Sequence, residues 1–149
     1  MSNISFFIHC IPPKHTAQGS NRIMKRKNGS MFVGKFATSK GKKTQNELMT
    51  ILHPFAPKKP LDGALNVRVW WLYPWLKSEP NKNRYGLKPC STRPDVDNLC
   101  KMLFDCMTRL GFWLDDGQIA TLTFHKAYSD DCGIKIEVSE IEMNPKLKA

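Results

Sequence analysis

An aspartate-rich segment with one internal lysine holds the residues of this 149-residue sequence that are best suited to catalysis. Five of the eight aspartates lie between positions 95 and 116. The segment supplies Asp95, Asp97, Lys101, Asp105, Asp115 and Asp116. Crowded carboxylates repel one another unless a cation neutralises them, and all-oxygen ligands favour Mg²⁺ or Mn²⁺. A lysine beside such a cation can stabilise charge on a phosphate under attack. The spacing therefore predicts a metal site for phosphodiester chemistry.

The local sequence predicts how these side chains come together. If residues 93–97 are extended, Asp95 and Asp97 point the same way. In the helix that we expect next, Lys101 lies four residues after Asp97 and therefore on the same face. The chain then turns back, which we expect to bring Asp116 beside Asp97.

Each carboxylate also has a purely structural interpretation. Asp97 fits a helix N-cap, residues 115–117 fit a turn, and Asp105 fits a solvated helix position. Together with the charge distribution, the set favours a metal site over separate structural roles. A calcium-binding EF-hand loop is excluded because Cys100 and Cys106 occupy the positions that require glycine and glutamate.

The net charge of +10 is unevenly distributed along the chain. Residues 1–94 hold 17 Lys and Arg against 3 acids, whereas residues 95–149 hold 6 against 10. The N-terminal part therefore has the charge of a surface that binds a polyanion such as nucleic acid, although a solvated loop is the alternative. The predicted phosphate-binding residues are Lys14, Arg22, Lys25, Arg26, Lys27, Lys82, Arg84, Lys88 and Arg93.

Aromatic residues add candidates for contacts with unpaired bases. Phe104 falls on the polar side of the predicted helix, where it either stacks on a base, packs in a dimer interface, or lies buried under a long loop. Trp70 and Trp71 point to opposite faces of a strand, so at least one of them belongs to the core.

The predicted elements indicate an α+β fold in a single domain, 1–149. Strands are expected at 4–11, 31–33, 65–73, 119–128 and 134–143, and helices at 39–52 and 98–110. Apolar residues alternate at the start of the 65–73 strand, and Gly111 is expected to end the second helix. The apolar stripe of that helix is Leu99, Leu103, Cys106 and Leu110. We expect a two-layer sandwich, in which a small mixed β-sheet carries two main helices. Basic loops occupy about 14–30, where a hairpin tip is the alternative, and 74–92. The last two strands are predicted to form a C-terminal hairpin, 119–143, with Asp130 and Asp131 in its turn.

Composition excludes several other classes of protein. No run of about 18 apolar residues occurs, which argues against a membrane-spanning helix. The five cysteines include no C-x-x-C pair, so a disulfide scaffold or zinc knuckle is disfavoured. We expect a cytoplasmic protein with reduced thiols and no membrane partner.

Three segments resemble the RusA family of Holliday junction resolvases, which are phage- and prophage-type endodeoxyribonucleases. They are RPDVDNLCK at 93–101, Phe104-Asp105, and GFWLDDGQ at 111–118. The family pattern is D-x-D-N-x-x-K, a helix segment with F-D, and a D-D-x-Q turn. Ile11-Pro12-Pro13 is similar to the strand end that opens the family domain.

The resemblance implies a homodimeric endonuclease that resolves four-way DNA junctions with Mg²⁺ or Mn²⁺ and no organic cofactor. It implies a catalytic core at 93–118, with Asp95, Asp97 and Asp116 as catalytic metal ligands and Lys101 as the catalytic lysine. Asp115 matches the less critical first aspartate of the pair and is a further candidate ligand.

Two departures from the family pattern concern substrate choice. The loop at 74–92 is longer, and the basic region at 19–29 differs. Two rival functions therefore stay open: a non-catalytic protein that binds junctions or single-stranded DNA, and a metal nuclease specific for flaps or forks. The first rival does not explain why a lysine and several aspartates share the start of one helix.

Overall fold

Alternating apolar side chains make Leu65–Tyr73 the central strand, β4, of a five-stranded sheet. The computed structural model describes residues 3–16, 20–36 and 39–142. β4 pairs in parallel with β6 (Ile119–Tyr128) and antiparallel with β7 (Gly133–Glu140). The edges are β1 (Asn3–His9), antiparallel to β7, and the two-residue β5 (Lys88–Pro89), antiparallel to β6. The mixed sheet that the sequence predicted is confirmed.

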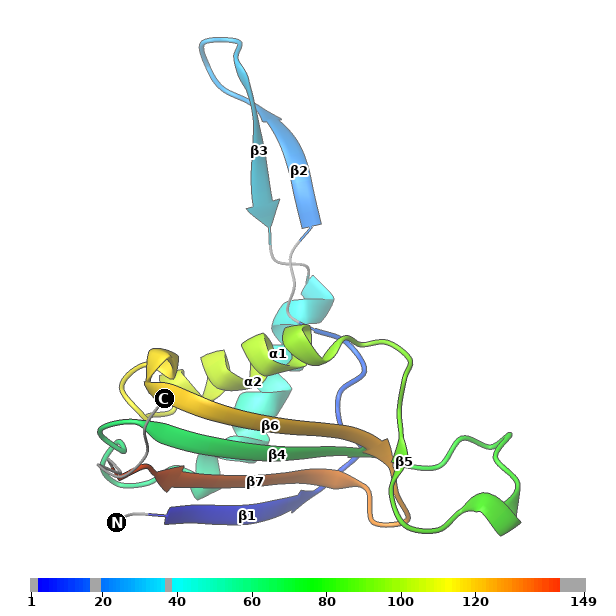
Figure 1. The fold of residues 1–149 in the computed structure, drawn as a ribbon. Coiled ribbons are helices and arrows are strands. Elements are labelled where there is room, and N and C mark those ends of the chain that lie inside the picture. The colour runs from blue at the N-terminus through cyan, green and yellow to red at the C-terminus, as the bar shows by residue number, and fades with distance from the viewer. Residues whose placement is uncertain (1–2, 17–19, 37–38, 143–149) are drawn as a thin grey trace, which may run out of the picture.

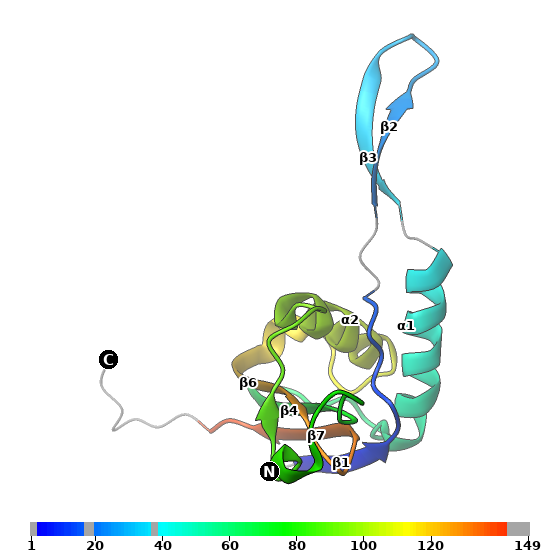
Figure 2. The ribbon, with the colours of Figure 1, turned by 90° about the vertical axis from the view of Figure 1, so that its right-hand side faces the viewer.

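Two helices cover one face of this sheet, as Figures 1 and 2 show. They are α1 (Ser39–Leu52) and α2 (Val96–Arg109). Short 3-10 turns occur at η1 (His53–Phe55), η2 (Asn81–Asn83) and η3 (Asp116–Gln118). The structure is thus a two-layer α+β domain, as expected. Within the described residues, neither helix is long and apolar enough to cross a bilayer.

The core lies between the helices and the inner face of β4 and β7. Leu65, Val67, Val69 and Trp71 of β4 have no solvent exposure, so every second residue of the strand faces the helices. Trp70 lies on the opposite face, stacked on His125 of β6 with ring centroids 5.4 Å apart. The expectation that at least one of the paired tryptophans belongs to the core is confirmed by Trp71.

The prediction of a C-terminal hairpin over 119–143 is wrong. β6 and β7 follow each other in the chain, but β4 lies between them in the sheet. The link passes over the end of β4, where the Ser129 amide donates to the Tyr73 carbonyl at 2.9 Å. Asp130, expected in a hairpin turn, instead accepts a 2.7 Å hydrogen bond from the Trp75 indole. Because β4 is the strand with the longest buried face, both C-terminal strands pair with it rather than with each other.

The basic segment at about 14–30 forms a hairpin, which was one of the two alternatives that the sequence allowed. Its two antiparallel strands are β2 (Ser20–Lys25) and β3 (Met31–Phe36). In Figures 1 and 2 this hairpin projects from the body beyond the start of α1. The short strand predicted at 31–33 is therefore part of a longer ribbon.

Gly111 ends α2, as the sequence predicted. Its φ of +81° is left-handed, and its amide donates to the Thr108 carbonyl at 3.1 Å. The next amide, of Phe112, donates to the Met107 carbonyl at 3.0 Å, which turns the chain back over the helix. This turn buries Phe112 and Trp113 in the core.

We expect Gly111→Ala to lower the free energy of unfolding by about 1–2 kcal/mol. A Cβ at this position meets nothing within 4 Å, so the cost comes from the backbone conformation alone. Gly111→Asn is the matched control and should cost less, because asparagine tolerates the left-handed region. Urea unfolding measures both variants, and equal losses would contradict this explanation.

Candidate active site

The start of α2 presents two of the predicted catalytic carboxylates. Asp95 is the N-cap residue, with an extended backbone (φ −71°, ψ 144°), and Asp97 lies in the first helical turn. The N-cap interpretation of Asp97 is therefore wrong by two positions. The Asp95 carboxylate makes no capping hydrogen bond, although its position would allow one. Both side chains are exposed and accessible to a ligand.

Lys126 of β6 fixes the segment that leads into Asp95. Its ammonium group donates to the carbonyls of Thr92 and Pro94, the latter at 2.7 Å. The Lys126 carbonyl in turn accepts from the Cys90 amide at 2.8 Å. Sequence reasoning missed this residue, although Lys126 follows Leu122 and Phe124 at alternate positions of the predicted strand and so falls on its apolar face. Lys126 is in register with the fully buried Trp71, so it lies on the inner side of the sheet, where a lysine requires partners.

A pocket of about 340 Å³ opens beside Asp95. Its lining residues are Lys14, His15, Thr16, Arg93, Pro94, Asp95 and Asn98. The pocket therefore brings the predicted phosphate-binding residues Lys14 and Arg93 to the same place as a predicted metal ligand. Tyr73 anchors the chain just before the lining residues Lys14, His15 and Thr16, because its phenol donates to the Pro13 carbonyl at 3.1 Å. Burial raises the pKa of Tyr73 to about 12, which keeps this donor protonated.

A second group of carboxylates lies where the chain returns past α2. The pKa of Asp116 is raised by its partial burial, then by the adjacent Asp115 carboxylate, and then by the charge of Asp105. Like charges are thus held together at an exposed position, and a cation is what would relieve their repulsion. Oxygen donors in such a group suit a hard divalent cation.

Gln118 holds the turn that carries these carboxylates. Its Oε1 accepts from the amides of Leu114 and Asp115, at 2.8 and 3.0 Å. Its Nε2 donates to the carbonyls of Leu61 and Gly63, both at 3.0 Å. All four hydrogen-bonding positions of the amide are therefore used. The glutamine of the D-D-x-Q motif positions Asp115 and Asp116, a role that the sequence motif alone did not indicate.

One polar stripe on α2 runs between the two groups of carboxylates. Asp97, Lys101 and Asp105 are exposed and spaced four residues apart, so they lie on one face of the helix. Asp97 and Asp105 lie about 12 Å apart along the helix axis, and it is the charge of Asp105 that contributes to the raised pKa of Asp116. Among the described residues, no three acidic, histidine or cysteine side chains lie close enough to hold a metal ion together. Asp95, Asp97 and Asp116 are thus not gathered into one ligand set, and their roles stay predictions.

The predicted phosphate-binding cations occupy three places. Lys14 and Arg93 line the pocket, Arg22 lies in β2, and Lys25, Arg26 and Lys27 form the tip of the β2–β3 hairpin. Lys82 is exposed in η2, between β4 and β5. Arg84 and Lys88 follow in the same long segment.

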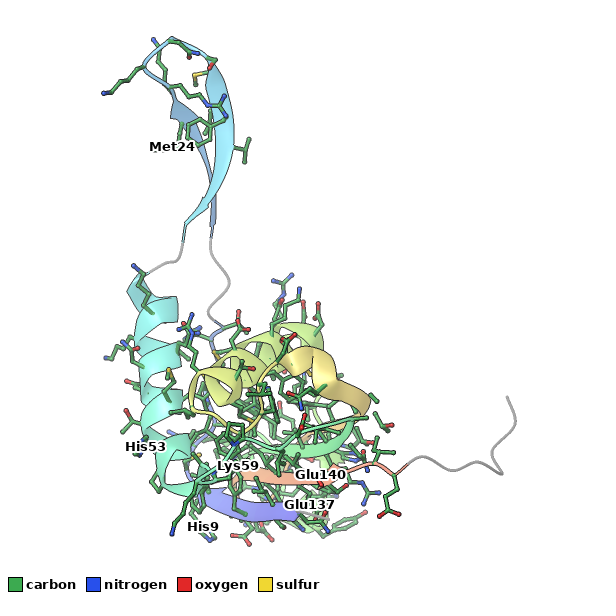
Figure 3. All side chains as sticks on the ribbon, turned by 90° about the vertical axis from the view of Figure 1, so that its left-hand side faces the viewer. His9, Met24, His53, Lys59, Glu137 and Glu140 are labelled. Atoms are coloured by element: carbon green, nitrogen blue, oxygen red, sulfur yellow. The ribbon has the colours of Figure 1, made fainter. Side chains whose placement is uncertain are left out.

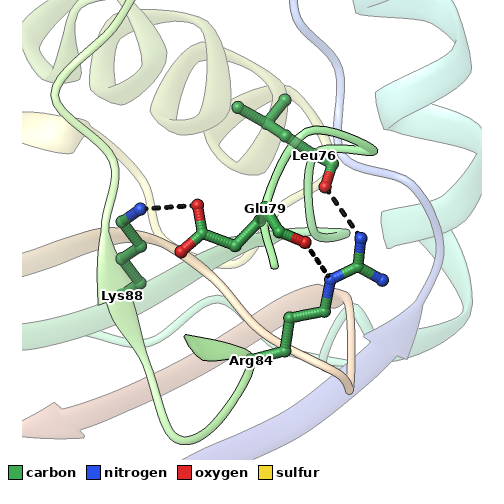
Figure 4. A network of polar contacts seen from close by, with 4 residues as sticks. All are labelled: Leu76, Glu79, Arg84 and Lys88. Atoms are coloured by element: carbon green, nitrogen blue, oxygen red, sulfur yellow. Dashed lines mark hydrogen bonds and ion pairs between the residues drawn. The ribbon is translucent and has the colours of Figure 1, made fainter. Parts of the chain in front are cut away.

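Arg84 and Lys88 also have a structural role in the long 74–92 segment (Figure 4). The Arg84 guanidinium donates to the carbonyls of Glu79 and Leu76, at 3.0 and 3.1 Å. Lys88 forms a 2.8 Å ion pair with the Glu79 carboxylate. These contacts order the segment from within, and sequence reasoning did not foresee them.

The prediction that Phe104 contacts DNA is contradicted. Its side chain is 6% exposed and meets the Trp113 ring edge to face, with centroids 5.9 Å apart. The buried arc of α2 is wider than a single apolar stripe, because the sheet covers one side of the helix and the returning chain covers the next. The third interpretation, burial under the long loop, was right about the burial of Phe104, and the ring that packs on it is Trp113 of the returning chain.

Comparison with known proteins gives one consistent result. The family described as Endodeoxyribonuclease RusA matches residues 12–139 of this chain. A crossover junction endodeoxyribonuclease of Lactococcus phage r1t is 43% identical over 51 residues, which is 34% of this chain and 39% of that protein. The corresponding enzyme of Escherichia coli K12 is 55% identical over 31 residues, 21% of this chain and 26% of that protein. The uncharacterized protein YqaN of Bacillus subtilis 168 is 30% identical over 147 residues, 95% of this chain and 99% of that protein.

We expect Lys126→Met to reduce metal-dependent DNA cleavage while leaving the fold intact. The methionine keeps the length of the side chain but leaves the Thr92 and Pro94 carbonyls without their donor, so Asp95 loses its fixed position. Lys135→Met, in β7 on the outer face of the sheet, is the control. Cleavage rates and circular dichroism are the measurements. A Lys126→Met protein that cleaves like the wild type would contradict the positioning role.

We expect Asp115→Asn to lower the pKa of Asp116 toward its ordinary value of 3.8, because it removes the adjacent like charge. In the wild type the folded protein holds this proton more tightly than the unfolded chain. Stability should therefore fall as the pH rises from 3.8 through the raised pKa, and this slope should flatten in Asp115→Asn. Carboxyl carbon NMR titration follows Asp116 directly, with Asp130→Asn as the control. An unshifted Asp116 titration in Asp115→Asn would show that burial and the charge of Asp105, without Asp115, raise its pKa.

Proposed function

Because this chain belongs to the RusA family of endodeoxyribonucleases, we propose that it is a Mg²⁺-dependent DNA endonuclease that resolves four-way junctions. The observation that carries the proposal is the pocket at the start of α2. There, cations suited to a phosphate meet a carboxylate suited to a hard metal. Flap or fork cleavage and binding without cleavage are the alternatives that the experiment below separates.

Asp95, Asp97 and Asp116 would hold Mg²⁺ or Mn²⁺, with Asp115 as a further ligand. Mg²⁺ commonly takes only one or two protein carboxylates and completes its shell with water and substrate phosphate oxygens. Asp95 and Asp97 at the start of α2 would supply these one or two carboxylates, because the structure does not gather Asp116 into one ligand set with them. When bound, the ion supplies charge neutralisation at the scissile phosphate and lowers the pKa of coordinated water.

The chain's own cations bind and orient the substrate in this proposal. Lys14 and Arg93 take the phosphates next to the scissile one, since they line the same pocket as Asp95. Lys101 stabilises the negative charge that develops on the reacting phosphate, because it lies one turn above Asp97 on the exposed stripe. Lys126 acts only through the segment whose carbonyls it binds.

Two-fold symmetry of the substrate suggests the assembly. A four-way junction has two equivalent strands to cut, and a symmetric homodimer would present one site to each. We propose that this chain acts as such a dimer and makes paired, symmetric nicks in DNA recombination and repair, within a bacterial or phage-infected cytoplasm.

The test is a cleavage assay on an end-labelled four-way junction, with duplex and flap DNA alongside, in Mg²⁺ and in EDTA. We expect paired symmetric cuts at the junction in Mg²⁺ alone. Asp97→Asn should abolish cleavage, and Lys101→Met should slow it by about 100-fold or more, while both bind the junction in EDTA.

Asp131→Asn is the control for loss of one exposed carboxylate, because Asp131 lies in the link between β6 and β7. Tight binding without cuts in either Mg²⁺ or Mn²⁺ would favour the binding-protein alternative. Preferential cutting of flaps would favour the other alternative, and unchanged cleavage by Asp97→Asn would remove that residue from the site.

A further inference from the structure

The β2–β3 hairpin exposes one apolar face. Ile23 and Val33 are direct partners in the register, as are Lys25 and Met31, so these four side chains share a face of the ribbon. Ile23, Val33 and Met31 are 71%, 67% and 61% exposed. Figure 3 shows the hairpin projecting from the body, and Met24, which it labels there, belongs to the opposite face of the ribbon. Apolar side chains gathered on a protruding element indicate a surface that a partner covers.

The tip of the hairpin is a basic turn closed by hydrogen bonds. The Arg26 amide donates to the Ser30 carbonyl at 2.8 Å, and Asn28 Oδ1 accepts from the Ser30 amide at 3.0 Å. The Arg26 guanidinium lies 5.0 Å from the centroid of the Phe32 ring, on the ribbon face opposite Ile23. Lys25 and Lys27 stay exposed. The turn therefore holds a cluster of cations in place before any ligand arrives.

Charge identifies the class of partner. Residues 1–46 hold nine Lys and Arg and no acid, so the hairpin and its flanks repel a second hairpin of the same kind. A polyanion is attracted instead. A two-stranded β-ribbon also has the width that the major groove of DNA admits. Shape and charge together favour a DNA duplex over a second copy of the chain.

We propose that the hairpin, residues 20–36, is a DNA-binding arm that enters a groove of one duplex of the substrate. Lys25 and Lys27 contact phosphates, and the face formed by Ile23, Met31 and Val33 lies against sugars and base edges. This inference rests on the proposed function only in that the substrate is DNA. It adds an apolar contact surface, remote from the carboxylates, that sets affinity and not the chemistry.

Hydrogen exchange with mass spectrometry tests the arm directly. An isolated two-stranded hairpin is marginally stable, so its amides should exchange rapidly in the free protein. Addition of four-way junction DNA in EDTA, at about 100 times the dissociation constant, should slow exchange in 20–36 by up to about 100-fold. Unchanged exchange would overturn the proposal. Protection that rises with protein concentration without DNA would overturn it in favour of a second copy.

Two variants separate the charged and apolar contacts. Lys25→Gln/Lys27→Gln should reduce the magnitude of the salt slope of junction binding by about 2. Its matched control is Lys58→Gln/Lys59→Gln, an exposed pair between η1 and β4, which should leave the slope unchanged. Figure 3 shows Lys59 on the body, away from the hairpin. Equal slopes in both double variants would mean that only the total charge matters and would overturn the phosphate contacts.

The apolar variant is Ile23→Thr/Met31→Thr/Val33→Thr, since threonine suits a strand and keeps the charge. Junction binding should weaken about tenfold at fixed salt, with an unchanged salt slope. Leu122→Thr/Ile141→Thr removes two exposed apolar side chains from the body and should bind normally. Binding as tight as wild type by the triple variant would overturn the apolar contact.

The failure of this proposal is distinguishable from failure of the proposed function. If the arm is wrong but the function is right, the arm variants bind and cleave the junction like the wild type. If the function is wrong and the arm is right, the wild type makes no cuts, yet its arm is protected by DNA.

Discussion

The ammonium group of Lys126 lies against the carbonyls of Thr92 and Pro94, and the geometry of the α2 start depends on this contact. A lysine on the inner face of a sheet must find acceptors, and backbone carbonyls of an irregular segment must find donors. The Lys126 ammonium group and these two carbonyls satisfy each other's hydrogen-bonding requirement. The result is that β6, which belongs to the sheet, sets the direction in which the chain enters the helix with Asp95 and Asp97.

The same principle operates at the other end of the polar stripe. Gln118 uses its whole amide to tie the 115–118 turn to the segment at 61–63. That tie holds Asp116 beside Asp115 and Asp105 despite their repulsion, which the raised pKa of Asp116 records. The fold thus holds negatively charged side chains closer together than their repulsion favours, and a bound cation would relieve that repulsion.

The sequence predicted what local pattern determines. The apolar spacing of α2, its end at Gly111 and the alternation in β4 each depend on neighbours within a few residues, and the structure confirms them. The strand order could not be predicted in this way, because β4 inserts between two strands that are consecutive in the chain. The family motif located the candidate aspartates, and their catalytic roles stay predictions.

The acceptors of the Lys126 and Gln118 side chains could not be named for a related reason. The carbonyls to which these two side chains donate lie 32 or more residues away in sequence, and no local motif identifies them. The predicted DNA contact of Phe104 was wrong for a different reason. A helical wheel assumes one buried side, whereas α2 is covered both by the sheet and by Trp113.

The position of β7 in the sheet has a consequence for how the chain folds during its synthesis on the ribosome. β7 is the only described strand that joins β1 to β4, and it pairs Asn3 with Ser139. Until residues 133–140 have left the exit tunnel, both β1 and β4 lack the neighbour that completes their ladders. Such pairing between distant segments is slow to form and leaves strand edges open meanwhile. The nascent chain therefore exposes its most apolar strand, β4, for almost the whole time that the remaining half is being translated.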